Sequence, residues 1–226
     1  MWWETARAGP ETGRLAGELT TDVAVIGAGF TGLSTALHLA EMGASVVVVE
    51  AGAIGEGASG RNAGHISPSL RHGGPEKLAR TRGREGAERL VRFQVGAADL
   101  VFERITRHAM DCGARRKGRL QLAHTPAAFD SLAGLADEYA AWGLDGILLD
   151  RDSARSASGS ERYFGAWRIA SAGVVNPLAY ARGLARAAME AGATVLTDSP
   201  IAGIRRTAAG WRAEGAAGAG TAARMV

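Results

Sequence analysis

The chain has 226 residues, of which 46% are hydrophobic and 22% are charged. This balance is typical of a globular protein, and it excludes a wholly disordered chain, a collagen-like repeat and a small disulfide-bonded scaffold. The formal net charge is +3, and the basic residues are scattered apart from one short run at 115–119, so we expect no nucleic-acid partner. The length permits one large domain or two small ones.

The cysteine count and the hydropathy pattern bear on location. Cys112 is the only cysteine, so no internal disulfide can form and a reducing compartment is expected. The N-terminus lacks the basic segment and apolar run of a signal peptide, and no apolar stretch approaches the roughly 20 residues that span a bilayer. No His/Cys cluster has metal-site spacing. We therefore expect a cytoplasmic protein without a membrane partner or a bound metal, and the oligomeric state stays open.

The first predicted elements follow an extended leader, residues 1–20. A short apolar run at 22–26 predicts a buried strand, and apolar residues at helical spacing predict a helix over 31–42. The run at 44–49 predicts a second buried strand. Together these segments form a strand–helix–strand unit, which a glycine-rich loop at 51–64 follows.

The middle of the chain predicts a different mixture of elements. A long amphipathic helix is expected over 84–110. A second helix begins at Thr125-Pro126, with Thr as N-cap and Pro at the first helical position, and runs to about 142–143. The strands predicted around it are 119–123, 147–149 and 163–170.

The last part returns to a strand–helix pattern. Asn176-Pro177 repeats the cap-plus-proline signal and opens a helix to residue 191. Residues 193–197 predict a strand. A hairpin is expected from 201–206 and 211–214, whereas 215–220, which contain only Ala and Gly, predict little.

The segment 27–32, Gly-Ala-Gly-Phe-Thr-Gly, is a GxGxxG motif between the first strand and the first helix. Gly27 permits a tight turn, Gly29 lets the backbone approach a pyrophosphate, and Gly32 lets helix and strand pack closely. The helix N-terminus presents free N–H groups to phosphates. Glu50, at the end of the second strand, can accept hydrogen bonds from ribose hydroxyls and disfavours NADP. The motif predicts a dinucleotide site and leaves NAD and FAD open; the alternative is a tight turn without a ligand.

The loop after Glu50 narrows this choice. Residues 55–65 read Gly-Glu-Gly-Ala-Ser-Gly-Arg-Asn-Ala-Gly-His. With this loop the sequence resembles the FAD-dependent amine and amino-acid oxidases of the D-amino-acid oxidase superfamily, above all the branch of gamma-glutamylputrescine oxidases. The leader Trp-Trp-Glu-Thr, the GxGxxG turn and the run Asn-Pro-Leu-Ala-Tyr-Ala-Arg-Gly-Leu from residue 176 match the same branch.

The resemblance implies a role for each loop residue. Ser59 would hydrogen-bond the pyrophosphate, and Arg61 would lie near the phosphates or the ribityl chain. Residues 62–64 would pass beside the isoalloxazine ring, and Ile201 would lie in the strand that pairs with the adenine. The implied cofactor-binding set is Gly27, Gly29, Phe30, Thr31, Gly32, Glu50, Ala51, Ala58, Ser59, Arg61, Asn62, Ala63, Gly64 and Ile201. The alternative for the loop is a flexible glycine-rich connection.

Catalytic residues are not identified by these patterns. His65 follows the flavin loop and is the weak candidate, but the branch more often has Gln at this place, so a role does not transfer. The activity that the resemblance implies is oxidation of the C–N bond of a small amine or amino acid, with hydride transfer to flavin N5 and hydrolysis of the resulting imine. The alternatives are an inactive fragment or remnant that at most binds FAD, and an NAD-dependent dehydrogenase.

The expected fold class is α/β: a Rossmann-like FAD-binding domain interleaved with an α+β substrate domain. After the leader, 21–83 and 172–226 are assigned to the FAD-binding domain and 84–171 to part of the substrate domain. Relatives continue beyond the strand that begins near the end of this sequence. The resemblance therefore implies a C-terminally truncated chain whose FAD-binding domain is incomplete.

Overall fold

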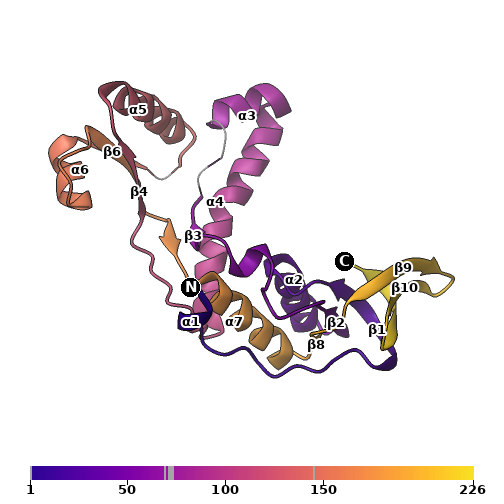
Figure 1. Ribbon diagram of the computed structural model, residues 1–226. Helices are drawn as coiled ribbons and strands as arrows, with labels where there is room; N and C mark the ends of the chain where they lie inside the picture. The colour runs from indigo at the N-terminus through magenta and orange to yellow at the C-terminus, as the bar shows by residue number, and fades with distance from the viewer. Residues whose placement is uncertain (1, 69, 71–73, 145) are drawn as a thin grey trace. The chain divides into compact units, whose positions relative to one another are not determined.

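The computed structural model describes residues 2–68, 70, 74–144 and 146–226 (Figure 1). The chain divides into two compact units. The first unit comprises the residues up to 64 together with 105–113 and 175–226, and the second comprises 65–104 and 114–174. The boundaries of the units thus lie at 64/65, 104/105, 113/114 and 174/175, whereas the predicted domain limits are 83/84 and 171/172.

The first unit is built around a six-stranded sheet in the order β8-β2-β1-β11-β10-β9. The four strands from β8 to β11 are parallel neighbours, and β10 pairs antiparallel with both β11 and β9. The strands are β1 (Gly17–Ile26), β2 (Val46–Val49), β8 (Thr194–Leu196), β9 (Ile201–Thr207), β10 (Gly210–Gly215) and β11 (Gly218–Met225). This mixed α/β architecture with a parallel sheet confirms the predicted fold class.

Burial explains why the first strands and helix form where the apolar patterns predict. All four valines of β2 are buried, as expected for a central parallel strand covered on both faces. Helix α2 (Phe30–Glu41) buries the apolar positions at helical spacing, which are Leu33, Ala36, Leu37 and Ala40. Helix α7 (Pro177–Glu190) packs against α2, and its N-cap Asn176 accepts a hydrogen bond from the Ala179 N–H at 3.0 Å.

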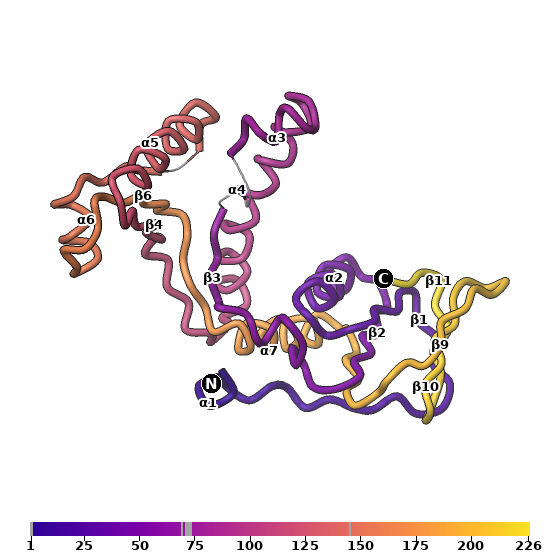
Figure 2. The backbone as a smooth tube through the Cα atoms, turned by 45° about the horizontal axis from the view of Figure 1, so that its top comes forward, coloured from indigo at the N-terminus to yellow at the C-terminus, as the bar shows by residue number. Residues whose placement is uncertain are grey.

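Two parts of the first unit differ from the sequence prediction. The leader is not extended throughout, because Trp2–Thr5 forms the short helix α1, and β1 begins at Gly17 instead of residue 22. The strand that the resemblance implies near the end of the chain is β11, which already begins within the Ala/Gly segment and pairs with β1 from Gly17↔Gly218 to Ala24↔Met225. Both strands lengthen because each supplies the other's backbone partners, which intrinsic strand propensity does not reveal. Figure 2 shows the C-terminal strands alongside β1.

The second unit contains a three-stranded antiparallel sheet in the order β4-β6-β5. Its core contains Tyr139 and Trp167, whose rings meet edge to face with centroids 4.7 Å apart. A two-stranded ladder, β3 (His65–Ile66) with β7 (Gly173–Val174), belongs to the same unit. The other elements are α3 (Pro75–Arg82), α4 (Arg84–Arg107, whose last residues belong to the first unit), β4 (Arg119–Ala123), α5 (Pro126–Ala141), β5 (Ile147–Leu149), α6 (Arg151–Ser158) and β6 (Gly165–Ile169).

The short helices α3 and α6 were not predicted. Their sequences are strongly polar and therefore lack an apolar stripe. The capping signals are nevertheless present: Pro75 opens α3, the Asp150 side chain accepts from the Ser153 N–H at 2.8 Å, and Gly159 ends α6 in the left-handed conformation.

Over the described part of the chain, no helix combines the length and apolar character needed to cross a membrane. Within those same residues, no cluster of three or more His, Cys, Asp or Glu side chains is arranged to hold a metal ion.

Candidate cofactor site

The turn between β1 and α2 is shaped by its glycines. Gly27 has φ +105°, a conformation that side chains disfavour, and its N–H donates to the Val49 carbonyl at 2.8 Å. A Cβ on Gly32 would lie 2.0 Å from the Gly27 oxygen and 3.1 Å from Val25 Cγ1. The start of α2 therefore packs directly on the turn, as the spacing of the motif predicts.

Glu50 lies at the end of β2, beside this turn. Its Oε2 accepts from the Ala28 N–H at 2.7 Å, and its Oε1 accepts from the Gly52 N–H at 3.0 Å. Its own backbone is held by the Leu196 carbonyl and the Ser199 N–H at 2.8 and 2.9 Å. Each carboxylate oxygen keeps further acceptor capacity, so the group can still accept hydrogen bonds from hydroxyls of a ligand.

A second polar group meets the N-terminus of α2. Ser59 lies in a short 3-10 turn, η1 (Ala58–Gly60), and its Oγ accepts from the Phe30 N–H at 3.0 Å. A Cβ on Gly29 would lie 3.0 Å from the same Oγ, so the glycine admits the serine. The first residues of α2 are uncharged, and the helix end carries the positive pole of the helix dipole. This end of α2 is suited to an anion.

The loop that continues from Ser59 is folded. The Asn62 amide donates to the Ser59 carbonyl at 2.8 Å and its Oδ1 accepts from the Gly64 N–H at 2.8 Å. Gly64 has φ +71°, and a Cβ there would lie 2.2 Å from the Val175 oxygen. The Gly64 carbonyl in turn accepts from the Val175 N–H at 2.9 Å. These bonds contradict the alternative of a flexible connection.

The other predicted residues surround this group. The Arg61 side chain is exposed and lies 3.9 Å from the Glu56 carboxylate. Ile201 opens β9 two residues after Ser199, which bonds to Glu50, and packs against a small core cluster that includes Leu196. The alanines 51, 58 and 63 and Thr31 are exposed, whereas the Phe30 ring is partly buried against Tyr180, with centroids 5.4 Å apart.

The structure thus brings the turn glycines, Glu50 and Ser59 into one cluster within the first unit. His65 belongs to the second unit, where it pairs with Val174 and its side chain is exposed. Sequence reasoning missed Ala28 and Gly52, whose N–H groups hold the Glu50 carboxylate. The acid itself is the signal that could have indicated these donors. A carboxylate at the end of a buried strand, beside a glycine turn, needs backbone N–H groups as hydrogen-bond donors.

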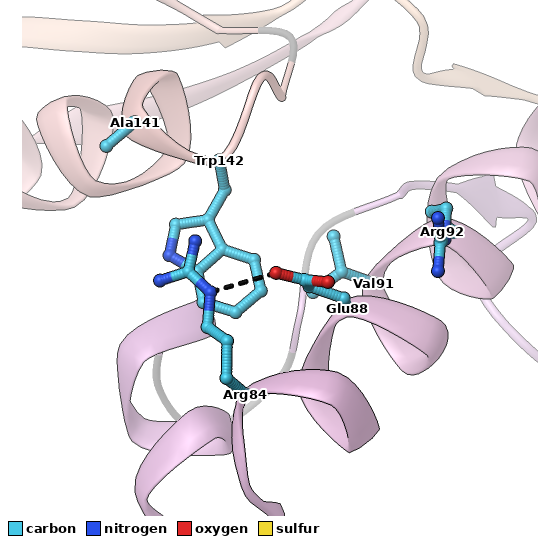
Figure 3. Close-up of a pocket in the computed structure, with 6 residues that line it drawn as sticks. All are labelled: Arg84, Glu88, Val91, Arg92, Ala141 and Trp142. Atoms are coloured by element: carbon cyan, nitrogen blue, oxygen red, sulfur yellow. Dashed lines mark hydrogen bonds and ion pairs between the residues drawn. The ribbon is translucent and has the colours of Figure 1, made fainter.

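A pocket in the second unit is separate from these residues (Figure 3). The Arg84 guanidinium stacks over the Trp142 ring at 4.1 Å, and its Nε donates to Glu88 at 3.0 Å. The charge of Arg84 is therefore already matched within the pocket. Its lining residues are Arg84, Glu88, Val91, Arg92, Ala141 and Trp142, which do not include a predicted site residue.

The donors and acceptors of the first unit fit FAD. A diphosphate needs N–H and O–H donors in front of a helix end, which the start of α2 and Ser59 provide. A ribose needs an acceptor for its hydroxyls, which Glu50 provides. The glycines leave the backbone uncovered where a cofactor has to come close.

Comparison with known proteins identifies the class of protein. Residues 22–226 match the family described as DAO, FAD dependent oxidoreductase. The chain therefore belongs to this family of FAD-dependent oxidoreductases, and FAD, not NAD, is its cofactor.

Particular relatives show how far the similarity extends. The gamma-glutamylputrescine oxidoreductase of Escherichia coli (strain K12) is 36% identical over 190 residues, which are 84% of this chain and 44% of that protein. Glycine oxidase from Geobacillus kaustophilus superposes with a TM-score of 0.77 at 25% identity, over 92% of this chain and 54% of that one. L-Amino acid deaminase from Proteus myxofaciens shares the fold with a TM-score of 0.80 at 21% identity, over 97% of this chain and 48% of that one. This chain spans about half the length of each.

Proposed function

We propose that this chain forms the FAD-binding part, and some of the substrate-binding part, of an oxidoreductase that oxidises the C–N bond of a small amine or amino acid. The observation that carries the proposal is the Glu50 carboxylate, which the Ala28 and Gly52 N–H groups hold beside the Ser59-supported end of α2. A carboxylate and a helix N-terminus so placed match the two ends of an adenosine diphosphate group.

We assign roles to the surrounding residues on the same basis. Ser59 and the first N–H groups of α2 would bind the diphosphate, Glu50 the ribose, and Arg61 the phosphates or the ribityl chain. Residues 62–64 would support the isoalloxazine ring, and Ile201 would support the adenine. The first unit is then the FAD unit, and the second unit, with its three-stranded sheet, contributes to the substrate unit.

When bound, FAD would supply the redox chemistry, which is acceptance of a hydride from the carbon beside the amine nitrogen. The residues of this chain bind and orient, because the groups placed at the site are glycines, backbone N–H groups, one hydroxyl and one carboxylate. Water would then hydrolyse the imine to a carbonyl compound and ammonia or an amine. His65 is a candidate for a proton-transfer role only through its position directly after the loop at 58–64.

The substrate class is proposed from the relatives. Their names include an oxidoreductase of gamma-glutamylputrescine and an oxidase of glycine, so a primary or secondary amine on a small, polar molecule is the common chemistry. The 36% identity favours a gamma-glutamylated or similarly extended amine. The single cysteine supports a cytoplasmic location.

FAD titration of the purified chain tests the proposal. We expect bound, yellow flavin and no competition from NAD. Glu50→Gln weakens FAD binding about tenfold to a hundredfold, because a hydrogen bond to a charged group contributes about 1.5–3 kcal/mol. Glu11→Gln, in the exposed leader, is the matched control and retains wild-type affinity. A colourless chain that ignores FAD contradicts the proposal.

A second candidate follows from the length. The chain spans 44% of its Escherichia coli relative, and the alternative proposal is a chain that binds FAD without oxidising a substrate. Reduction of the bound flavin by a panel of amines under anaerobic conditions separates the two: bleaching of the yellow colour supports the oxidoreductase, and unchanged absorbance supports a chain that only binds FAD.

A further inference from the structure

The leader is attached to the first unit along its length. Arg182 and Arg186, on the exposed side of α7, donate to the main-chain oxygens of Arg7 and Ala8 at 2.9 and 3.1 Å. Two arginines are thus used to hold backbone carbonyls of a segment whose sequence predicts no regular structure. These bonds bring the first residues of the chain to the N-terminal end of α7.

Helix α1 is fixed there by one asparagine. The Asn176 Nδ2 donates to Thr5 Oγ1 at 3.0 Å and to the Trp2 carbonyl at 3.4 Å. The Oδ1 of the same side chain accepts from the Ala179 N–H and so caps α7. A single amide therefore joins the start of α7 to the start of the chain.

From this position α1 reaches the cofactor loop, residues 58–64. The Trp2 indole Nε1–H donates to the main-chain oxygen of Asn62 at 2.9 Å. The Arg61 guanidinium lies 5.9 Å from the centre of the Trp3 ring, within cation–π range. Two adjacent tryptophans thus contact two adjacent residues of the loop.

The contact of Trp2 lies between the two anchored ends of the loop. The loop is anchored at one end by Ser59, which bonds to Phe30, and at the other by Gly64, which bonds to Val175. Trp2 contacts the middle of the loop. The hydrogen bond joins a segment outside the strand–helix core to the loop backbone.

The peptide group after Asn62 links this contact to the cofactor. In a trans peptide the carbonyl and the following N–H lie in one plane and point in opposite directions. Holding the Asn62 oxygen therefore also fixes the direction of the Ala63 N–H, which faces away from the indole. A backbone donor held in one direction binds a partner without a further ordering cost.

We propose that Trp2 is a positioning residue for the cofactor: its indole N–H holds the Asn62 carbonyl and thereby orients the Ala63 N–H toward FAD. The inference rests on the proposed use of the loop at 58–64 for FAD. It assigns to the leader a part in cofactor affinity, through one hydrogen bond that neither the GxGxxG turn nor Glu50 supplies.

Two measurements on the whole chain test this role. Trp2→Phe keeps the ring and removes the donor. Trypsin cleavage after Arg61, followed by mass spectrometry without added FAD, should accelerate relative to cleavage after the exposed Arg162 of the second unit. The FAD dissociation constant should rise about threefold to tenfold, the effect of losing one neutral hydrogen bond. Trp142→Phe removes an equivalent indole donor, which bonds to Glu76 at 2.8 Å, and is the matched control.

The outcomes separate the two proposals. Selective cleavage after Arg61 together with weaker FAD binding supports the role of Trp2. Equal acceleration at Arg61 and Arg162 shows a general loss of stability and overturns it, as does wild-type FAD affinity in Trp2→Phe. If the wild-type chain binds no FAD, the proposed function fails. Unchanged cleavage after Arg61 in Trp2→Phe would then show that the Trp2 hydrogen bond does not order the loop, and would overturn the role of Trp2 as well.

Discussion

The two units differ in where their tight glycines lie and in the size of their buried rings. In the first unit, several glycines lie where a side chain would collide with a backbone atom, as at Gly32 and Gly64. In the second unit Gly173 is a glycine of the same kind, with a Cβ position 2.4 Å from the Arg115 oxygen, and the core is built around the buried Tyr139–Trp167 pair. The difference teaches where a cofactor site can form: a cofactor bound by N–H groups needs uncovered backbone, which glycines supply in the turn at 27–32 and the loop at 58–64.

The largest expected effect is a loss of stability in the second unit. Trp167→Ala removes a side chain that is 1% exposed and leaves a cavity beside Tyr139, which costs about 3–5 kcal/mol. Urea unfolding monitored by circular dichroism measures the loss. Trp211→Ala, on β10 of the first unit, is the control, and because its ring is only partly buried a clearly smaller loss is expected. Equal losses would show that the two tryptophans contribute alike and that the contrast between the units is wrong.

The next largest effect is a loss of stability in the first unit, caused by a substitution at a glycine. Gly32→Ala places a Cβ against the Gly27 oxygen and should cost about 1–3 kcal/mol by overpacking, with a loss of FAD affinity because the turn has to move. Gly134→Ala, in helix α5 of the second unit, adds a Cβ into open space and should be stabilising by up to about 1 kcal/mol. Thermal unfolding measures the change in stability of both variants. A change of the same sign in both would contradict the contrast between the crowded Gly32 and the unobstructed Gly134.

The smallest effect concerns acid stability and sharpens the comparison. In the first unit, hydrogen bonds from Arg212 hold the pKa values of Glu18 and Glu214 below the ordinary 4.5. In the second, hydrogen bonds from Ser153 lower the pKa of Asp150 below 3.8. Since each pKa is lower in the folded chain, this stabilisation is present above the ordinary pKa and is lost as the pH falls through the lowered one.

Variants separate the two contributions. Glu18→Gln should lower stability at neutral pH and lose its difference from wild type as the pH falls below about 4. About 1 M salt should shrink the neutral-pH difference as well, because the Glu18 side chain is exposed and Arg212 is only partly buried. Asp150→Ala, which removes a local cap, should be much less sensitive to salt. Urea titrations at two pH values and two salt concentrations measure this, and a salt-independent Glu18→Gln effect would count against the ion pair.

The local elements of the chain could be predicted because their causes lie in neighbouring residues. The valines of β2, the apolar stripe of α2 and the Asn176-Pro177 start of α7 were located from the sequence alone. The helices α3 and α6 were missed because they are short and strongly polar, with few apolar residues to reveal a buried face. The turn at 27–32 was predicted with its steric reasons, since those depend on which residues lack a Cβ.

What only the tertiary structure decided are the contacts between distant segments. The Ala- and Gly-rich segment 218–225 forms β11 because β1 offers it backbone partners, and composition gives no sign of this. The glycine-rich loop is ordered because Phe30, Val175 and Trp2 each bond to it from elsewhere in the chain. The sequence by itself determined where a dinucleotide turn and its acid lie. The fold decided which N–H groups face the acid and what holds the loop, because hydrogen bonds between remote residues depend on how the chain returns to itself.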